Sequence, residues 1–436
     1  MKLNWFSPLP PARTDIAHYT MRVLPALSRL ADVTLWTDQR DVDSALKRQV
    51  EVRSFRLDRM PWSELNRAAA CFYQIGNNPL FHGAIWQVSR LHSGVVVLHD
   101  FSLHHFFDGL YRVQWRDLAS YQAVMDMYYG EEGRREAAES YHNEGRNIGY
   151  MAERYPLTRL AVENALGVVV HTQSSFDSLS QDSRPLVCAP LPFASDTISL
   201  PRSAKEPGPP YRLIVFGYIG RNRRLETLLQ ALAELPERAQ FQLDIYGEIL
   251  DGEERLRSLL RSLDLKRQVS LHGFTSEAKL DQALSGAHLA INLRFPTMGE
   301  ASGSQLRIWA HALPSLVSRV GWYASLPGEA VSFVRPDANE LADIQRNLRA
   351  FLANPGAFAA MGEHGRAVLE QQHSCEQYAE TIIRMAQRAI EFRARAASLR
   401  LAERAGVLLS EWLGTNGVAE SGANVAREIL EFGGGR

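Results

Sequence analysis

Short apolar runs that alternate with longer helical patterns are the feature of this sequence that most limits its possible folds. In the first half the run at Val95–Leu98 consists of Val and Leu alone, which suits a strand buried on both faces. Strands that alternate with helices predict a parallel, doubly wound sheet. The predicted strands of the first half are Leu3–Phe6, Val33–Trp36, Val50–Arg53, Ala70–Ile75, Val95–Leu98 and Gly167–Val170.

The same alternation restarts after a proline-rich segment, residues 201–210 (PRSAKEPGPP), which reads as a linker. A chain of 436 residues exceeds what one core normally supports, so two domains are expected. We predict an N-terminal Rossmann-like domain at 1–200, a second one at 211–375, and C-terminal helices with a tail at 376–436. The predicted strands of the second half are Leu213–Phe216, Phe241–Tyr246, Val269–Leu271, Leu289–Leu293 and Ser315–Val317.

Two helical regions stand outside this alternation, and each allows two interpretations. An insertion at about 111–160 is polar and rich in tyrosine. It is a hairpin that stabilises one edge of the sheet, or else a lid or acceptor platform. The region Cys375–Trp412 carries arginines that form a solvated face or, as the alternative, contact a membrane surface. These arginines are Arg384, Arg388, Arg393, Arg395, Arg400 and Arg404.

Composition excludes several classes of function. Lys and Arg number 48 against 49 Asp and Glu, so the net charge of −1 gives no reason to expect nucleic acid as a partner. The three cysteines, Cys71, Cys188 and Cys375, have no paired spacing, which fits a reducing compartment. The sequence shows neither a signal peptide nor a transmembrane segment. We therefore expect a cytoplasmic protein, with peripheral contact at the inner face of the membrane as the alternative.

Histidines follow the predicted strands of the first half. Ligands of open parallel sheets bind beyond the carboxyl ends of the strands, so these positions are candidates for a site. His99 is the best candidate to act on a substrate, with a structural histidine as the equal alternative, whereas packing is the expected role of His104 and His105. This cluster lacks the spacing of zinc ligands, so no metal is expected. The polar residues at these strand ends are Ser7, His99, Asp100, His104, His105 and His171.

Glycines and arginines follow the strands of the second half. Gly217 and Gly220 allow tight turns, and Arg221, Arg223 and Arg224 come just before a predicted helix. Free amides at a helix start and guanidinium groups both favour a phosphate. The small residues 299–304 precede a further helix, after Arg294. Two such helix starts suggest a diphosphate ligand, although each motif alone is common.

Several segments resemble the retaining glycosyltransferases of family 4, and in particular a bacterial branch involved in polysaccharide and surface-glycan synthesis. They are SPLPPARTDIAHYT (7–20), YQIGNNPLFHG (73–83), VVVLHDFSLHHFF (95–107), GVVVHTQSS (167–175), LRFPTMGEASGSQLR (293–307) and VSRVGWYASLP (317–327). The resemblance implies the GT-B fold, in which two Rossmann-like domains face a central cleft. It further implies a nucleotide-sugar donor bound by the C-terminal domain and no metal or other cofactor.

The resemblance also assigns roles to residues. Arg223 matches the basic residue that stabilises the departing diphosphate, and Glu300 matches the acidic residue that contacts the sugar hydroxyls. The implied catalytic residues are His99, Asp100 and Glu300. The implied donor-binding residues are Gly217, Arg221, Arg223, Arg224, Arg294, Ser302, Gly303, Ser304 and Arg307. The implied acceptor-binding residues are Ser7, His104 and His171.

Three positions depart from the family pattern. The family has a second glutamate about eight residues after the first, where Arg307 or Ile308 stands here. Arg224 occupies a usual glycine position, and Thr14-Asp15 replaces the paired glycines of the first loop. The expected activity is transfer of a hexose to a glycan or lipid-linked glycan acceptor. The alternatives are a catalytically silent glycan-assembly partner, a nucleotide-sugar epimerase and a phosphorylase.

Overall fold

The computed structural model describes residues 1–142, 147–181, 183–194, 208–250 and 252–413. Residues 201–207 of the predicted linker and the predicted tail from 414 onward lie outside this part of the chain. The chain divides into two compact units. Unit 1 comprises Met1–His171, Ser175–Ala189 and Ala379–Arg436, and unit 2 comprises Thr172–Ser174 and Pro190–Tyr378.

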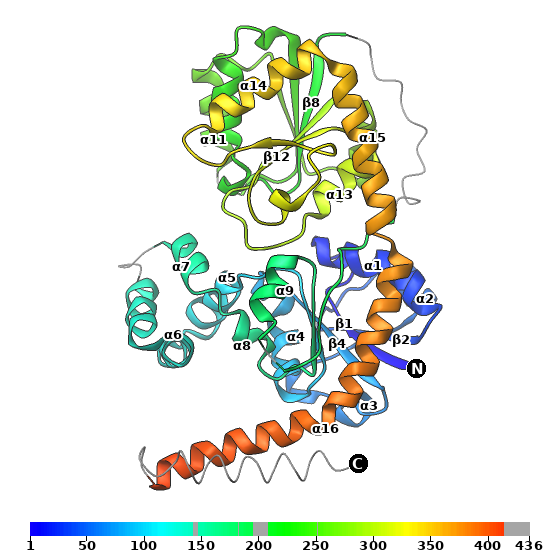
Figure 1. The fold of residues 1–436 in the computed structure, drawn as a ribbon, viewed down its shortest axis with the longest axis vertical. Coiled ribbons are helices and arrows are strands. Elements are labelled where there is room, and N and C mark those ends of the chain that lie inside the picture. Colours follow the sequence, from blue (N-terminus) through cyan, green and yellow to red (C-terminus); the bar gives the residue numbers. More distant parts are fainter. Residues whose placement is uncertain (143–146, 182, 195–207, 251, 414–436) are drawn as a thin grey trace. The chain divides into compact units, whose positions relative to one another are not determined.

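Unit 1 is built on a parallel sheet of seven strands, in the order β3-β2-β1-β4-β5-β6-β7 (Figure 1). The interior strand β1 pairs with β2 on one side and β4 on the other, where Trp5 stands opposite Leu35 and Phe72. Chain order reverses between β1 and β4, which makes this edge a topological switch point. The strands are β1 (Lys2–Phe6), β2 (Asp32–Thr37), β3 (Glu51–Ser54), β4 (Ala70–Ile75), β5 (Val95–Leu98), β6 (Gly167–Val170) and β7 (Leu186–Cys188).

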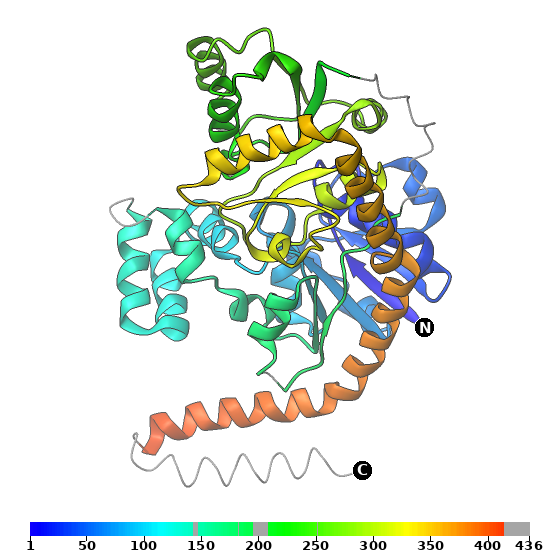
Figure 2. The same ribbon diagram turned by 45° about the horizontal axis from the view of Figure 1, so that its top comes forward.

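Helices follow the strands of unit 1 and begin at polar caps. Thr14 caps the first long helix, and Asn78 caps α4 ahead of Pro79, whose fixed φ suits a first helical position. Figures 1 and 2 show α6 and α7 side by side, within the predicted insertion. The helices are α1 (Asp15–Ser28), α2 (Ser44–Gln49), η1 (Leu57–Arg59), α3 (Trp62–Leu65), α4 (Pro79–Leu91), α5 (His104–Asp108), η2 (Gly109–Trp115), α6 (Leu118–Tyr141), α7 (Ile148–Arg154), α8 (Thr158–Val162) and α9 (Gln173–Leu179).

The last helix, α16 (Cys375–Leu413), belongs to unit 1 from Ala379 onward. It buries apolar side chains such as Ile382 and Met385. Arg384, Arg388, Arg393 and Arg395 are exposed, as expected for a solvated face, and arginines of this helix also donate to groups of unit 1. Arg393 donates to the carbonyl of Ala69 at 2.9 Å, and Arg400 donates to Ser93 Oγ at 3.0 Å. These acceptors precede β4 and β5, so α16 lies along the amino ends of the strands.

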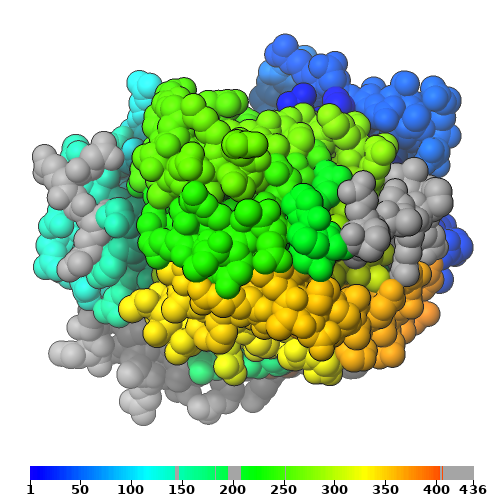
Figure 3. All heavy atoms as spheres, turned by 90° about the horizontal axis from the view of Figure 1, so that it is seen from above, coloured from blue at the N-terminus to red at the C-terminus, as the bar shows by residue number. Residues whose placement is uncertain are grey.

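Unit 2 repeats the architecture with six parallel strands in the order β10-β9-β8-β11-β12-β13, and its switch point lies between β8 and β11. Helix α14 packs on α10 and α15. Figure 3 shows one side of this unit, formed by green and by yellow-to-orange segments. The strands are β8 (Tyr211–Phe216), β9 (Phe241–Tyr246), β10 (Val269–Gly273), β11 (Leu289–Asn292), β12 (Ser315–Ser318) and β13 (Ser332–Val334). The helices are η4 (Arg221–Arg223), α10 (Leu225–Ala233), η5 (Arg238–Gln240), α11 (Glu253–Ser262), α12 (Glu277–Gly286), α13 (Gly303–Ala310), η6 (Gly321–Ser325), α14 (Glu340–Ala353) and α15 (Pro355–Gln372).

The prediction of two Rossmann-like, doubly wound domains is confirmed by these two parallel sheets. All eleven strands expected from the apolar runs are present, and two short edge strands, β7 and β13, were not expected. Each has only three residues, and neither is fully buried along its length. A run of this length is too short to show a period.

Candidate functional site

Two glycines shape the carboxyl end of β8 at the switch point of unit 2. Gly217 has φ of +105°, and a Cβ there would lie 2.9 Å from Arg223 Nη2. Gly247, which follows β9, has φ of +126°, and a Cβ there would lie within van der Waals overlap of the Gly217 carbonyl oxygen. The two backbones therefore touch, and the space beside Gly217 belongs to the guanidinium group of Arg223.

The Arg223 side chain is 7% exposed and spans the switch point from η4 toward β11. Its Nη1 donates to Asn292 Oδ1 at 2.7 Å, and its Nη2 lies 3.5 Å from Ser304 Oγ. Its Nε donates to the carbonyl of Tyr218 at 3.4 Å. The structure thus brings together predicted residues from the loop after β8, Gly217 and Arg223, and from the first turn of α13, Ser304.

A chain of buried polar side chains continues from Arg223 into unit 2. Asn292 Nδ2 donates to Gln305 Oε1 at 3.0 Å, and Gln305 Nε2 donates to Ser315 Oγ at 2.8 Å. Asn292 is 3% exposed, and Gln305 and Ser315 are fully buried. The sequence analysis did not single out these three residues.

The first turn of α13 faces the same loops. Ser302 caps the helix and accepts a hydrogen bond from the Gln305 amide at 3.1 Å. The amides of Gly303 and Ser304 belong to the first turn, where a helix offers no internal acceptor. A Cβ built at Gly303 would meet no atom within 4 Å, so the space in front of this residue is open. An anionic group can approach this helix start, whose dipole favours negative charge.

Glu300 precedes this helix and is largely buried. Its Oε2 accepts hydrogen bonds from the Met298 amide and the Thr297 hydroxyl, both at 2.7 Å. Its Oε1 lies 3.5 Å from Nε of Arg294, which follows β11. The carboxylate is therefore held in one place, and the predicted pair of Arg294 and Glu300 is in contact.

The remaining predicted arginines of unit 2 are engaged elsewhere or lie outside this group. Arg224 donates to Glu340, the buried first residue of α14, at distances from 2.5 to 3.0 Å. Arg307 pairs with Glu277 and Asp281 of α12 at 2.6 and 2.7 Å. Arg221 is exposed on η4. The carboxylates that hold Arg224 and Arg307 neutralise these side chains, so neither joins the residues around Arg223.

In unit 1 the structure places His99 beside His171. Their ring centroids lie 5.1 Å apart, and Tyr19 of α1 stands edge-on to His99 at 4.7 Å. His99 Nε2 lies 3.0 Å from Oε1 of Gln74, a fully buried residue of β4. His171 Nδ1 lies 2.9 Å from the carbonyl oxygen of Ala189, an acceptor that fixes the proton on this nitrogen. Two of the three predicted histidines therefore form one group.

The protonation state of this group follows from burial. Loss of solvent, together with the nearby His171 and His82, holds the pKa of His99 well below its usual 6.5. Burial likewise lowers the pKa of His82 to about 4. At neutral pH these rings are uncharged, so His99 can exchange hydrogen bonds with a ligand but adds no positive charge.

Ser7 and His104, both named as acceptor-binding candidates, do not join this group, and the burial of His104 agrees with the packing role also expected for it. Ser7 is fully buried, and its hydroxyl lies 2.7 Å from Thr20 Oγ1. His104 is fully buried, with its Nδ1 2.6 Å from the Tyr155 carbonyl oxygen and its Nε2 2.8 Å from the Tyr121 hydroxyl. Both side chains therefore serve packing.

Asp100 orders the neighbouring loop, since its Oδ2 accepts the amide of Asn77 at 2.8 Å. This bond joins the loops that follow β4 and β5. Gln74 and Asn292, in contrast, are polar side chains at the carboxyl ends of otherwise apolar runs, ACFYQI and LAIN. A buried polar residue requires a partner, and that requirement is the signal by which both could have been singled out.

None of the helices described is long and apolar enough to cross a membrane. No three His, Cys, Asp or Glu side chains in the described ranges are grouped so that they could hold a metal ion.

Comparison with known proteins agrees with this architecture. Residues 196–368 match the family described as Glycosyl transferases group 1. Sucrose-phosphate synthase from Thermosynechococcus elongatus is similar in structure, with 20% sequence identity, a TM-score of 0.59 and coverage of 89% of this chain and 98% of that chain. Among curated proteins, none matches the sequence.

Two further solved structures resemble the chain along nearly their whole length. The Anabaena protein HepE in complex with UDP-glucose has 14% identity, a TM-score of 0.59 and coverage of 89% and 99% of the two chains. WaaG, a glycosyltransferase involved in lipopolysaccharide biosynthesis, has 14% identity, a TM-score of 0.53 and coverage of 88% and 99%. At such identities the likeness concerns the fold. The chain therefore has the two-domain GT-B fold, and its residues 196–368 match the family of glycosyl transferases group 1.

Proposed function

We propose that the protein is a retaining glycosyltransferase that moves a hexose from a nucleotide-sugar donor to a glycan or lipid-linked glycan acceptor. The observation that carries this proposal is the buried Arg223 guanidinium, which lies with the first turn of α13 at the switch point of unit 2. A cation and open helix amides at one point suit a diphosphate. The group 1 match covers these residues, and HepE, a protein of similar fold, binds UDP-glucose in its solved structure.

In the proposed reaction the bond between the sugar C1 and the diphosphate oxygen breaks, and its electron pair stays on that oxygen. Arg223 and the amides of α13 stabilise the negative charge that develops there. The acceptor hydroxyl oxygen forms the new bond on the same face of C1 and gives its proton to the leaving phosphate oxygen. Glu300 binds the hydroxyls of the donor sugar. His99, which is neutral at pH 7, is the residue of unit 1 that we propose to act on the substrate.

The first experiment measures the thermal stability of the protein with GDP, UDP, dTDP, ADP and the corresponding nucleotide sugars. A ligand at 100 times its dissociation constant stabilises the native state by about 2.7 kcal/mol, which corresponds to a shift of several degrees. A response confined to one base identifies the donor class. Incubation of that donor with oligosaccharide acceptors, followed by NMR of the new anomeric centre, tests retention. An unchanged rate in EDTA is expected, because no metal has a role in this scheme.

A catalytically silent assembly partner of GT-B fold is the second candidate function. It is favoured by the position of the family's second glutamate, where Ile308 is buried in the core and Arg307 is paired with α12. Neither side chain can supply the missing carboxylate. Measured turnover with any activated sugar excludes this candidate. A donor that binds but is neither transferred nor hydrolysed supports it.

A further inference from the structure

We infer that Asn292 and Gln305 are positioning residues that hold the charged group of Arg223 toward its anionic ligand. The inference rests on the proposed function insofar as it takes this ligand to be the donor diphosphate. The contacts that support it lie within unit 2 and involve β11, α13 and β12.

The bond between Arg223 and Asn292 sets the orientation of every other side chain in this hydrogen-bonded series. A guanidinium group only donates hydrogen bonds, so the oxygen of Asn292 must face Arg223. The Asn292 amide nitrogen then points to Gln305, whose oxygen must accept. The Gln305 nitrogen in turn donates to the Ser315 hydroxyl, which can accept. Reversing either amide would set two donors or two acceptors against each other in a buried place, so a single arrangement is stable.

Asn292 binds Arg223 without cancelling its charge. Arg224 and Arg307, by comparison, donate to the carboxylates of Glu340 and Asp281. A carboxamide partner at 2.7 Å fixes the guanidinium and leaves its positive charge for an incoming anion. The neutral amide at position 292 therefore leaves Arg223 able to bind an anionic ligand, whereas the carboxylate partners of Arg224 and Arg307 give those arginines a structural role.

Gln305 connects this arginine to the helix start on the other side of the site. Its backbone amide binds the capping hydroxyl of Ser302, while its side chain joins Asn292 to Ser315. The same residue thus fixes the first turn of α13 and the guanidinium group. Both features that face the anion keep one geometry before the ligand arrives, which is the condition for electrostatic stabilisation of a transition state.

The decisive variant is Asn292→Asp, which places a negative charge beside Arg223 at nearly constant volume. The buried chain can adapt, because the Gln305 amide can reverse and donate to the new carboxylate while Ser315 donates in turn. We expect the variant to fold and to bind inorganic pyrophosphate at least about tenfold more weakly, with transfer slowed about 100-fold at saturating donor. The matched control is Gln242→Glu, the same change at the amino end of β9, where Gln242 binds Ser270. It should leave both quantities unchanged.

A double-mutant cycle shows whether position 292 acts through Arg223. In an Arg223→Ala background, Asn292→Leu, which removes the contact without adding a charge, should cost nothing further in pyrophosphate binding or in transfer. Equal losses with and without Arg223 would overturn the inference. So would an Asn292→Asp protein that binds pyrophosphate as the unchanged protein does.

Thermal unfolding without ligand keeps this test independent of the proposed function. If Arg223 and Asn292 are coupled, Asn292→Leu lowers the unfolding temperature by several degrees in the presence of Arg223 and by much less in its absence. Additive losses would contradict the contact itself. If the unchanged protein responds to no nucleotide, nucleotide sugar or pyrophosphate, the proposed donor site fails, and the unfolding cycle still decides the positioning of Arg223.

Discussion

At the scale of single residues, the two carboxylate oxygens of Glu300 differ in how tightly their partners hold them. Oε2 accepts two hydrogen bonds from the adjacent loop, whereas Oε1 lies near Arg294 at 3.5 Å. The two loop bonds hold the carboxylate in place through Oε2. Because Oε1 has only the longer ion pair, it is the oxygen that can accept a hydrogen bond from a sugar hydroxyl. A carboxylate accepts hydrogen bonds from hydroxyl groups strongly because it carries charge.

The change Glu300→Ala tests this residue. We expect folding to persist and transfer to fall by about 100-fold or more, since one charge-assisted contact to the reacting sugar is lost. The measurement is the initial rate of transfer together with the unfolding temperature. Thr297→Val, which removes one of the two loop bonds to Glu300 together with the bond from the Gly299 amide to the Thr297 hydroxyl, should retain most of the rate. Full activity in the Glu300→Ala protein would remove this residue from the site.

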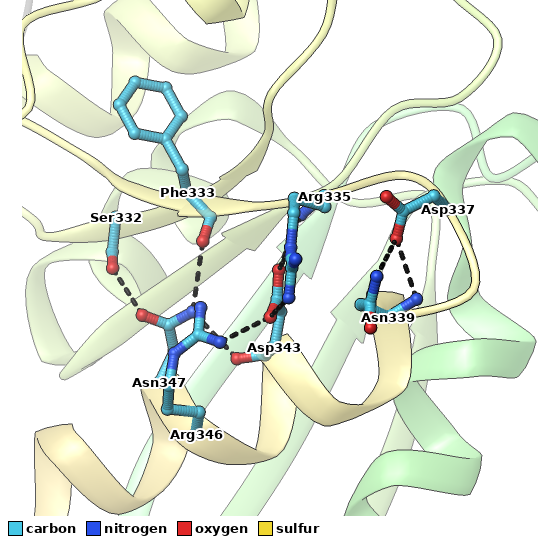
Figure 4. Close-up of polar contacts among 8 residues, drawn as sticks. All are labelled: Ser332, Phe333, Arg335, Asp337, Asn339, Asp343, Arg346 and Asn347. Atoms are coloured by element: carbon cyan, nitrogen blue, oxygen red, sulfur yellow. Dashed lines mark hydrogen bonds and ion pairs between the residues drawn. The ribbon is translucent and has the colours of Figure 1, made fainter.

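At the scale of elements, a buried carboxylate joins β13 to α14 (Figure 4). Asp343 is 1% exposed and accepts from Nε and Nη2 of Arg335, both at 2.8 Å, and from Nη1 of Arg346 at 2.5 Å. Asn347, one turn later, donates to the carbonyl of Phe333 at 3.2 Å. The hydrogen bonds of the two arginines hold the pKa of Asp343 well below its usual 3.8. The short strand β13 thus depends on side-chain contacts as much as on its ladder.

Asp343→Asn should therefore destabilise unit 2 in a pH-dependent way. A lowered carboxyl pKa contributes stability above the unfolded pKa near 3.8, and this contribution disappears as the pH falls through the folded value. At pH 7 we expect the unfolding temperature to fall by about 4–8 °C, with a smaller difference near pH 3. Asp337→Asn, at an exposed position in the same loop, is the control. A pH-independent difference would show that packing, and not charge, is responsible.

The sequence was most informative where an element is long and apolar. Runs such as Val95–Leu98 identify buried strands because no other element of that length buries every side chain. Strand β7 was missed because it has only three residues, all partly exposed, and its position is set by pairing with β6. In the site, Arg223 and Glu300 come from loops with recognisable composition. Asn292 and Gln305 could not be ranked, because their roles arise from partners that are distant in sequence.

At the scale of the whole molecule, buried neutral histidines concentrate in unit 1. Burial lowers the pKa of five histidines of unit 1, and in unit 2 it lowers the pKa of His373. The five are His82, His92, His99, His104 and His105. When the pKa of a histidine is lower in the folded state, the unfolded chain gains the proton first. The free energy of unfolding therefore falls as the pH decreases from about 6.5 toward the folded pKa.

Acidification should therefore loosen unit 1 before unit 2. Each fully buried histidine costs up to about 1.4 kcal/mol per pH unit below 6.5, down to about pH 4 for His82 and His104. Hydrogen exchange at pH 7 and pH 5, referred to intrinsic rates, should show protection falling first in β4, β5 and α5. His104→Gln should reduce this dependence on pH, whereas His364→Gln, at an exposed position, should not. Earlier loss in unit 2 would contradict the assignment.

The path of the chain through unit 1 has a consequence for biosynthesis. The chain leaves this unit at Ala189 and returns at Ala379, where α16 brings Ile382 and Met385 to bury against it. A ribosome therefore synthesises all of unit 2 before it makes the segment that completes unit 1. Domains usually fold in the order in which they are synthesised. Here unit 1 is the first unit whose synthesis begins and the last whose synthesis is completed. A truncated chain that ends before residue 379 should contain all of unit 2 but an incomplete unit 1, to which a chaperone would have reason to bind.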